Sequence, residues 1–412
     1  MSYCAEIIAV GTEILLGDIV NTDAQTVARA LGELGINVYY NTVVGDNPER
    51  LRAAVEIAKS RADIIITTGG LGPTFDDLTK QTLAECFGKK LVLNEKELEK
   101  IRGFFAKIGR EMTKNNEQQA YLPEDCVVLE NAWGTAPGCA FFADNTHVLM
   151  LPGPPRECVP MMRERAVPYL KQLSDAALVS HELKIFGMGE SSVEDKVRHI
   201  AEHMTNPTLA PYAKEGETLL RVTGRAENEE AADALTRPMI AQVYELLGEY
   251  IYGMDVPSLA HVVYSLLKEK GLTLATAESC TGGLLSKMMT DLPGVSEVFL
   301  GGVCAYQNEI KEKLLFVPHE ILESKGAVSE ECAAAMAEGA RVALGADIGV
   351  GITGIAGPGG GTEEKPVGTV YVAVSNGEET RVVKSRGHRD RGTIRNMAAL
   401  TALDQIRRLV GR

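Results

Sequence analysis

Apolar, β-branched runs alternate with amphipathic segments along the first 170 residues of this chain. Strand-like and helix-like segments follow one another through residues 6–10, 23–34, 37–44, 48–60 and 63–67. This is the βαβαβ order of an α/β domain. Hydrophobicity is continuous in residues 64–66 and 148–151, which predicts central strands of a parallel sheet that are buried on both faces. Ligands are then expected at the carboxyl ends of the strands.

The pattern changes near residue 174. A smaller α+β unit follows, with predicted strands at 181–186 and 218–223 and predicted helices at 191–204 and 229–247. From residue 257 a helix and further strands alternate with alanine-rich helices, at 257–270, 272–275, 330–343, 348–352, 369–374 and 393–409. We therefore predict an α/β protein in three parts: residues 1–172, a small α+β connector at 173–254, and an α/β domain at 255–412.

Composition narrows the classes of partner. The chain has 412 residues, of which 45% are hydrophobic. A chain of this length is usually too long to fold around one hydrophobic core, so we expect two or three domains. Its net charge of -14 argues against a surface that wraps nucleic acid, although one basic pocket could hold a nucleotide phosphate. Residues 1–6 lack a secretory pattern and no apolar run is long enough to cross a bilayer, so we expect a cytoplasmic protein with no membrane partner.

The eight cysteines are scattered without any C-x-x-C pair. Neither a zinc knuckle nor a disulfide scaffold is therefore indicated. Most of the cysteines read as small buried residues. Cys280 is the exception, because it lies in a segment with the features of a reactive turn.

That segment, residues 274–283, is an apolar run that stops at a hydroxyl-rich turn before a helix-like pattern. Ser279 can be a nucleophile there, while Thr281, Gly282 and Gly283 could present backbone N–H groups to a phosphate or an oxyanion. A capping turn is the alternative, since Ser and Thr are favoured caps and Gly allows a tight turn. A Cys280 thiol at a helix start would compete as nucleophile.

A glycine-rich loop at residues 67–79 directly follows a predicted buried strand. Gly69, Gly70 and Gly72 would let backbone amides approach phosphoryl oxygens, and Asp76 and Asp77 could hold a divalent cation that bridges those oxygens. The alternative is a loop whose aspartates are solvated or cap the next helix.

Two further loops with carboxylates should reach the same edge of the sheet. Glu13 follows the first strand, and Asp46 follows the second and is the better candidate for a second acid. Taken alone, Asp46 before Pro48 reads as a residue at a helix start. The corner at residues 151–157 could close the pocket or be only a rigid turn.

These motifs carry a resemblance to known families. Gly11-Thr-Glu13, Asp46, the Thr-Gly-Gly-x-Gly-x-Thr-x-Asp-Asp-x-Thr loop and the Leu-Pro-Gly-x-Pro corner resemble the molybdopterin-binding fold of the MogA and MoaB type. Four C-terminal motifs resemble the CinA C-terminal domain, at residues 276–283, 301–311, 326–329 and 351–358. With both parts in this order, essentially the whole chain is similar to the CinA competence/damage-inducible family.

The resemblance implies two hydrolases. It implies a three-layer N-terminal domain that is an ADP-ribose pyrophosphatase, with a divalent metal near Asp46, Asp76 and Asp77. Gly69, Gly70, Gly72, Thr74 and Glu13 would then bind substrate. It implies a nicotinamide mononucleotide deamidase without a cofactor in the C-terminal domain. These nucleotides would be the partners, with no nucleic acid, and a homodimer is expected.

Residue by residue, the resemblance implies Ser279 as nucleophile, Tyr306 and Lys311 as proton-handling partners, and Thr353, beside Gly354, as completing the pocket. Hydrolysis of a carboxamide requires an activated nucleophile, and a lysine can serve as base where desolvation lowers its pKa. Without the resemblance, Lys311 would read as a solvated helix charge and Tyr306 as a half-buried strand residue.

The substrate phosphate needs a cationic receptor, and residues 386–395 supply a basic loop before the last helix. The resemblance points to Arg391 and Arg395, although relatives often read Gly-Asp-Arg where this chain has Arg389-Asp390-Arg391. A solvated arginine cluster is the alternative. Residues 357–361 read as a surface loop that could act as a lid.

Two other functions fit the sequence. The N-terminal domain could be a pterin-binding or adenylyl-transferring module without hydrolase activity. The chain could also be a non-catalytic partner in DNA uptake or repair, which its acidic balance opposes.

Overall fold

The computed structural model describes residues 3–173, 177–202, 205–387 and 390–411, with only the backbone of Arg386. Its contacts divide the chain into two compact units, Met1–Val179 with Gly224–Ala234, and Ser180–Thr223 with Leu235–Arg412. The three-part division expected from the sequence stays a prediction. No described helix is long and apolar enough to cross a membrane.

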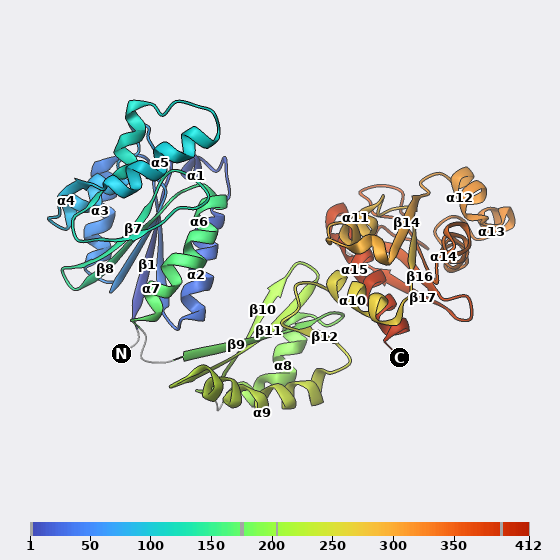
Figure 1. Ribbon diagram of the computed structural model, residues 1–412. Coiled ribbons are helices and arrows are strands. Elements are labelled where there is room, and N and C mark those ends of the chain that lie inside the picture. The colour runs from blue at the N-terminus through green and yellow to red at the C-terminus, as the bar shows by residue number, and fades with distance from the viewer. Residues whose placement is uncertain (1–2, 174–176, 203–204, 388–389, 412) are drawn as a thin grey trace. The chain divides into compact units, whose positions relative to one another are not determined.

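A six-stranded sheet forms the centre of the N-terminal domain (Figure 1). Its order is β2-β1-β3-β8-β7-β6, and the first four strands are parallel while β7 and β6 are antiparallel to their neighbours. The strands are β1 (Cys4–Val10), β2 (Asn37–Val44), β3 (Ile64–Thr68), β6 (Val127–Leu129), β7 (Gly138–Ala143) and β8 (Thr146–Leu151). The predicted central strands are confirmed, because β3 and β8 are neighbours inside the sheet and buried almost throughout.

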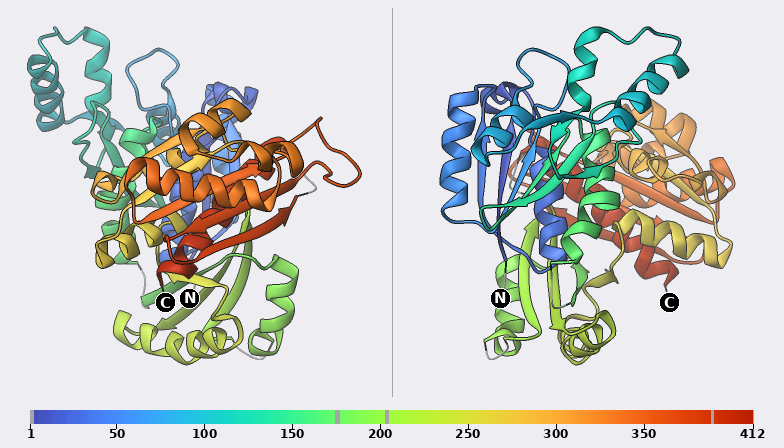
Figure 2. Two further views of the ribbon diagram at one scale, coloured as in Figure 1. Left: turned by 90° about the vertical axis from the view of Figure 1, so that its right-hand side faces the viewer. Right: turned by 60° about the vertical axis from the view of Figure 1, so that its left-hand side comes forward.

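Helices cover both faces of this sheet, as the views in Figures 1 and 2 show. One face packs against Val27 and Leu31 of α2 and Met161 of α6, and the other against Val55 of α3 and Leu83 of α4. The helices are α1 (Thr12–Leu16), α2 (Thr22–Glu33), α3 (Pro48–Lys59), α4 (Thr79–Cys86), α6 (Pro155–Met161), η2 (Met162–Ala166) and α7 (Val167–Lys171). The expected three-layer α/β architecture is therefore confirmed.

An excursion between α4 and β6 projects beyond the sheet (Figure 2). It contains β4 (Leu91–Leu93), α5 (Glu95–Lys107), η1 (Lys114–Ala120) and β5 (Tyr121–Pro123). Leu98 and Ile101 of α5 pack with Ala120 of η1, and β4 pairs with β5. The sequence analysis did not predict this excursion. Its last part, η1, lies against the glycine-rich loop.

The middle part is a four-stranded sheet in the order β10-β11-β9-β12. Its elements are β9 (Ala177–Ile185), α8 (Glu190–Ala201), β10 (Thr208–Lys214), β11 (Glu217–Ala226), α9 (Glu229–Leu247) and β12 (Ile251–Met254). Apolar residues of α8 and α9, among them Val193, Val197 and Val243, share a core with Leu220 and Val222 of β11. The predicted α+β character is confirmed.

The C-terminal domain holds a five-stranded sheet in the order β14-β13-β15-β16-β17. The first three strands are parallel, and β16 and β17 continue antiparallel. The strands are β13 (Leu274–Glu278), β14 (Phe299–Cys304), β15 (Ile348–Gly354), β16 (Thr369–Ser375) and β17 (Thr380–Arg386). The carboxyl ends of β13, β14 and β15 meet at one edge, which brings the segments after residues 278, 304 and 354 together.

Helices again pack on both faces of this sheet. One core joins α10, α11 and α15 to Val350 and Val372, and another joins α12 and α14 to Ala275 and Ala277. The elements are α10 (Leu259–Lys270), α11 (Leu284–Thr290), η3 (Val295–Glu297), α12 (Asn308–Leu315), α13 (His319–Ser324), α14 (Glu330–Leu344) and α15 (Arg391–Val410). The Asp390 carboxylate accepts a hydrogen bond from the Thr393 amide and so starts α15, the helix that carries Arg391 and Arg395.

Candidate functional site

The Ser279 turn lies at the carboxyl edge of the C-terminal sheet. The Ser279 amide donates to the Ile352 carbonyl at 2.9 Å, which holds the turn against β15. Gly282 and Gly283 have φ of 59° and 92°, which other residues rarely adopt, and Gly283 precedes α11. The N-cap of α11 is Gly283 and not Ser279, so the capping alternative for Ser279 is wrong.

A buried carboxylate supports this turn from below. Glu278 is 1% exposed, and its carboxylate accepts from the amides of Leu285 and Ser286 at 3.0 and 2.8 Å and from the Ser286 hydroxyl at 2.7 Å. These bonds satisfy the first N–H groups of α11. Sequence reasoning missed this role, although Glu278 precedes Ser279 directly.

Lys311 is buried beside the same strand end. It is 1% exposed, and its Nζ donates to the carbonyls of Ala305 and Tyr306 at 2.9 and 3.3 Å. The Ala305 amide in turn donates to the Glu278 carbonyl at 2.9 Å, one residue before Ser279. Burial lowers the pKa of Lys311 below its ordinary value of 10.5. The solvated helix charge that the sequence alone would suggest is not found.

Tyr306 and Arg391 meet although 85 residues separate them. Tyr306 is 56% exposed in the loop between β14 and α12, so it is not the half-buried strand residue of the simpler interpretation. Its hydroxyl accepts from Arg391 Nη2 at 3.2 Å, and Arg391 Nη1 donates to the Gly357 carbonyl at 2.7 Å. Arg391 thus links the loop after β14 to the loop after β15.

Arg395, one turn further along α15, reaches the Ser279 turn itself. Its Nη2 donates to the Thr281 carbonyl. Among the described residues, the buried Thr281 hydroxyl and Arg395 Nε have no hydrogen-bond partner, which is costly unless a ligand supplies one. Arg389, which the sequence also implicated, lies outside the described residues.

The competing thiol is poorly suited to attack. Burial raises the pKa of Cys280 to about 11, although the nearby Arg395 and Arg391 cations lower it. The thiol is therefore protonated at neutral pH, and thiols in that form are weak nucleophiles. Arg391, Arg395 and Lys311 all interact electrostatically with Cys280, the neighbour of Ser279.

Thr353 and Gly354 end β15. The Thr353 hydroxyl, in a side chain that is 1% exposed, donates to the Ala327 carbonyl at 2.6 Å, so it joins the loop before α14 to this edge. A Cβ on Gly354 would come within 2.8 Å of the Thr369 carbonyl oxygen. Packing against β16 therefore explains Gly354 without a ligand.

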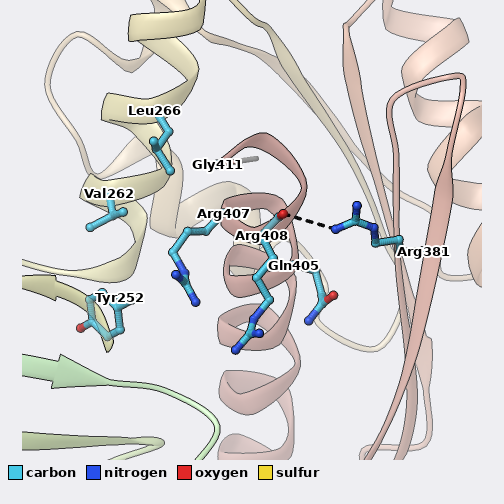
Figure 3. A pocket seen from close by; sticks show the side chains of 8 residues that line it. All are labelled: Tyr252, Val262, Leu266, Arg381, Gln405, Arg407, Arg408 and Gly411. Carbon is cyan, nitrogen blue, oxygen red and sulfur yellow. Dashed lines mark hydrogen bonds between the residues drawn. The ribbon is translucent and has the colours of Figure 1, made fainter. Parts of the chain in front are cut away.

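A second basic region lies elsewhere, in a pocket of about 600 Å³ (Figure 3). Its arginines are already paired: Arg407 and Arg408 donate to Asp404, and Arg381 donates to the Arg408 carbonyl. These contacts stabilise the last turn of α15, where cations oppose the negative end of the helix dipole. These contacts explain why arginines line this pocket without a bound phosphate.

In the N-terminal domain, three loops after parallel strands touch through glycines. Gly69 and Gly70 have φ of 96° and 68°. A Cβ on Gly69 would lie 2.1 Å from the Val10 carbonyl oxygen, and one on Gly153 would lie 3.2 Å from Gly69 Cα. The corner at residues 151–157 is thus in backbone contact with the glycine-rich loop. The buried hydroxyls of Thr67 and Thr79 beside this loop have no hydrogen-bond partner in the part of the chain that the structure describes.

Asp76 and Asp77 stabilise the glycine-rich loop, and the N-cap of α4 is Leu78. The Thr74 amide donates to Asp77 at 2.8 Å, and the Thr74 hydroxyl is within hydrogen-bonding reach of both Asp76 and Asp77. A Cβ on Gly72 would meet the Asp77 carboxylate at 2.5 Å. The carboxylates of Asp76 and Asp77 thus both lie beside the Thr74 hydroxyl. A cation site would need neighbouring carboxylates of this kind.

Asp46 lies against the start of α1. It accepts from the amide and hydroxyl of Thr12 at 2.9 and 2.8 Å, while Asn47 caps α3, so its interpretation as a helix-start residue is wrong. Glu13 faces Gly11, whose Cβ would lie 2.9 Å from the carboxylate. No three His, Cys, Asp or Glu side chains among the described residues form a ready-made metal cluster.

Three family models match consecutive parts of the chain. They are the “Probable molybdopterin binding domain” over residues 6–172, the “Damage-inducible protein CinA KH domain” over 180–253 and the “CinA C-terminal domain” over 256–410. A CinA-like protein of Dictyoglomus thermophilum is 51% identical over 403 residues, which cover 98% of each chain. The chain belongs to the CinA family.

A second relative and a solved structure are also similar to this chain. A CinA-like protein of Kosmotoga olearia is 52% identical over 406 residues, again 98% of each chain. The crystal structure of the competence/damage inducible protein CihA from Agrobacterium tumefaciens matches 37% of this chain and 94% of that chain, at 38% identity and a TM-score of 0.36.

Proposed function

We propose that the C-terminal domain hydrolyses nicotinamide mononucleotide to nicotinate mononucleotide and ammonia, and that the N-terminal domain hydrolyses ADP-ribose to AMP and ribose 5-phosphate. The observation that carries the first activity is the buried Lys311 amine. This amine donates to the Ala305 carbonyl, and the Ala305 amide donates to the carbonyl of Glu278, the residue before Ser279. A buried lysine with a lowered pKa is a candidate general base.

The contacts of Lys311 suit that role. A neutral amine has two N–H donors and one lone pair, and the Ala305 and Tyr306 carbonyls can accept both donors. The lone pair is then left to take the proton of the Ser279 hydroxyl. Serine attack on the carboxamide would give an acyl-enzyme and release ammonia with the lysine-held proton, and water would hydrolyse the ester.

The surroundings of the turn suit the rest of the substrate. Backbone amides at a glycine turn can stabilise an oxyanion, and arginine binds phosphate through paired donors. Arg391 and Arg395 lie near Cys280, and the unpartnered Thr281 hydroxyl offers a further donor. These groups support a ligand with a carboxamide and a phosphate.

The purified protein is expected to release ammonia and nicotinate mononucleotide from nicotinamide mononucleotide in equal amounts, with a chelator present. Nicotinamide riboside, which lacks the phosphate, should be at least about tenfold poorer in kcat/KM, because it cannot use the arginines. Coupled ammonia assay and product chromatography measure both. If no ammonia is released at any substrate concentration, the deamidase proposal is wrong.

For the N-terminal domain, Asp76 and Asp77 would hold a divalent cation together with phosphate oxygens of the substrate. The fit is partial but chemically sound, since Mg²⁺ in such sites commonly takes one or two carboxylates plus substrate phosphates. A bound cation would offset the charge of the diphosphate. Asp46, which accepts hydrogen bonds from Thr12, would interact with the cation only through its charge.

Changing Asp77 to Asn is expected to lower ADP-ribose hydrolysis at least roughly 100-fold, because it removes a carboxylate from the proposed cation site and weakens the Thr74 turn. Asp125→Asn is the matched control, in an exposed turn of the same domain with φ of 59°, which Asn tolerates. Full activity of Asp77→Asn in excess chelator would remove the proposal.

The name of the matching N-terminal model favours a second candidate, a pterin-binding module. Pterin fluorescence that co-purifies with the protein, without ADP-ribose hydrolysis, would favour it. A DNA-binding role has less support. Residues 177–254 carry thirteen acidic residues against seven Lys and Arg, the opposite of a phosphate-binding surface.

A further inference from the structure

We infer that the pocket beside the glycine-rich loop is a subsite for a 6-aminopurine base, with Phe75 as the stacking platform and Gln118 as the group that recognises the amine. This rests on the proposed N-terminal activity and names the part of its substrate that this pocket would bind. The pocket measures about 520 Å³ and is lined by Pro73, Thr74, Phe75, Asp76, Asn115 and Gln118.

Phe75 is the first reason. Its side chain is 91% exposed, although it stands between Thr74 and Asp76 in a hydrogen-bonded loop. An aromatic ring that a hydrogen-bonded loop carries into water is well suited to stack on a flat ligand, and nucleobases stack on such rings. Its position next to Asp76 would put the attached phosphates over the glycine-rich loop and the proposed cation.

The loop is stiff because η1 holds it from the other side. Gln118 Nε2 donates to the carbonyls of Gly72 and Thr74 at 3.2 and 3.0 Å, and Asn115 Nδ2 donates to the Pro73 carbonyl at 3.0 Å. Three successive carbonyls of the loop are thus bound by side chains of η1. The backbone that leads into Phe75 is thereby held, while its ring is left exposed.

A buried lysine fixes η1 in turn. Lys80 is 6% exposed, and its Nζ donates to the carbonyls of Gln118 and Gln119 at 3.0 and 2.7 Å. Burial lowers the pKa of Lys80 to about 8. Since Lys80 belongs to α4, directly after the glycine-rich loop, both walls of the pocket are tied to one helix.

Gln118 supplies the selectivity. Both hydrogens of its amide nitrogen are used by Gly72 and Thr74, so its orientation is set. Its amide oxygen receives no hydrogen bond from the part of the chain that the structure describes, and the side chain is exposed. An acceptor held there suits an exocyclic amine, as at C6 of adenine, and disfavours a base with a carbonyl at that position.

The first test compares ADP-ribose with its hypoxanthine analogue, inosine diphosphate ribose, on the full-length protein. The wild type should prefer ADP-ribose roughly tenfold in kcat/KM, because the analogue replaces a donor with an acceptor. Gln118→Ala should bring the ratio near one. Equal use of both substrates by the wild type would overturn the role of Gln118.

The second test measures AMP binding by calorimetry, which needs no hydrolysis. Phe75→Leu should weaken AMP roughly 10- to 100-fold with little change for ribose 5-phosphate, whereas Phe75→Tyr should bind AMP nearly as well as wild type. Phe104→Leu, on α5 outside the pocket lining, is the matched control. Unchanged AMP affinity in Phe75→Leu would overturn the stacking role.

The two measurements separate this inference from the proposed function. If ADP-ribose is not hydrolysed but AMP binds in a Phe75-dependent way and better than IMP, the subsite stands and the hydrolase proposal fails. If ADP-ribose is hydrolysed while Phe75→Leu changes neither KM nor AMP affinity, the subsite fails and the hydrolase stands.

Discussion

Replacing Ser279 by alanine is expected to lower kcat for nicotinamide mononucleotide at least roughly 1000-fold, because the proposed nucleophile is lost. The turn should survive, since it is held by the Ser279 amide and by Glu278, and neither depends on the Ser279 hydroxyl. Substrate affinity, measured by calorimetry, should therefore stay within about threefold of wild type.

Cys280→Ala is the control for the competing nucleophile. The thiol is 6% exposed and belongs to the core that joins α11 and α15 to the sheet, so its removal should cost about 1 kcal/mol of stability and little activity. An active Ser279→Ala protein beside an inactive Cys280→Ala protein would transfer the nucleophile role to the thiol. A tenfold loss of affinity in Ser279→Ala would make Ser279 a binding residue instead.

Much of the fold was accessible from the sequence because burial and periodicity act locally. The continuous apolar runs that form β3 and β8 occupy the middle of the sheet as predicted, and α2 and α3 alternate with strands as their amphipathic patterns require. The direction of the outer strands was not accessible. Antiparallel β16 is buried almost as continuously as β15, which pairs in parallel with β13, so burial alone does not distinguish the two directions.

The site was accessible only where a motif marks it. Ser279 and the glycine-rich loop stand out locally, but the partners that give them an environment are distant in sequence. Lys80 meets the carbonyl of Gln119 across 39 residues, and Arg395 meets that of Thr281 across 114. No local pattern encodes such contacts, which is why the support of the glycine-rich loop by η1 was missed.

Capping preferences misled the sequence analysis at two of the loops for one physical reason. Asp46 and Asp77 are short acceptors that favour local backbone donors, and helix N-termini are only one source of such donors. Here the donors are the amide of Thr12, the first residue of α1, and the amide of Thr74, in the loop after β3. Asp46 therefore binds the start of α1 and not that of α3, while Asp77 stabilises a loop.

Lys311→Met is expected to reduce kcat for deamidation by roughly 100- to 10,000-fold, because it removes the proposed general base while keeping the length of the side chain. Lys311→Arg should be as inactive, since guanidinium stays protonated. Lys313→Met, an exposed position on the same helix, is the matched control and should keep wild-type activity. Wild-type activity in Lys311→Met would remove the proposed mechanism.

The pH dependence tests the same amine independently. Because burial lowers the pKa of Lys311 below 10.5, kcat/KM should rise with pH through that lowered pKa and level off above it, and Lys311→Met should lose this rise. The free energy of unfolding should also increase with pH. Between the lowered pKa and 10.5 the unfolded chain binds more protons at this position, so the wild type should gain stability relative to Lys311→Met as pH rises through that window. A relative stability that does not change with pH would mean that Lys311 titrates like an ordinary lysine, and such an amine would be protonated and unable to accept the serine proton at neutral pH.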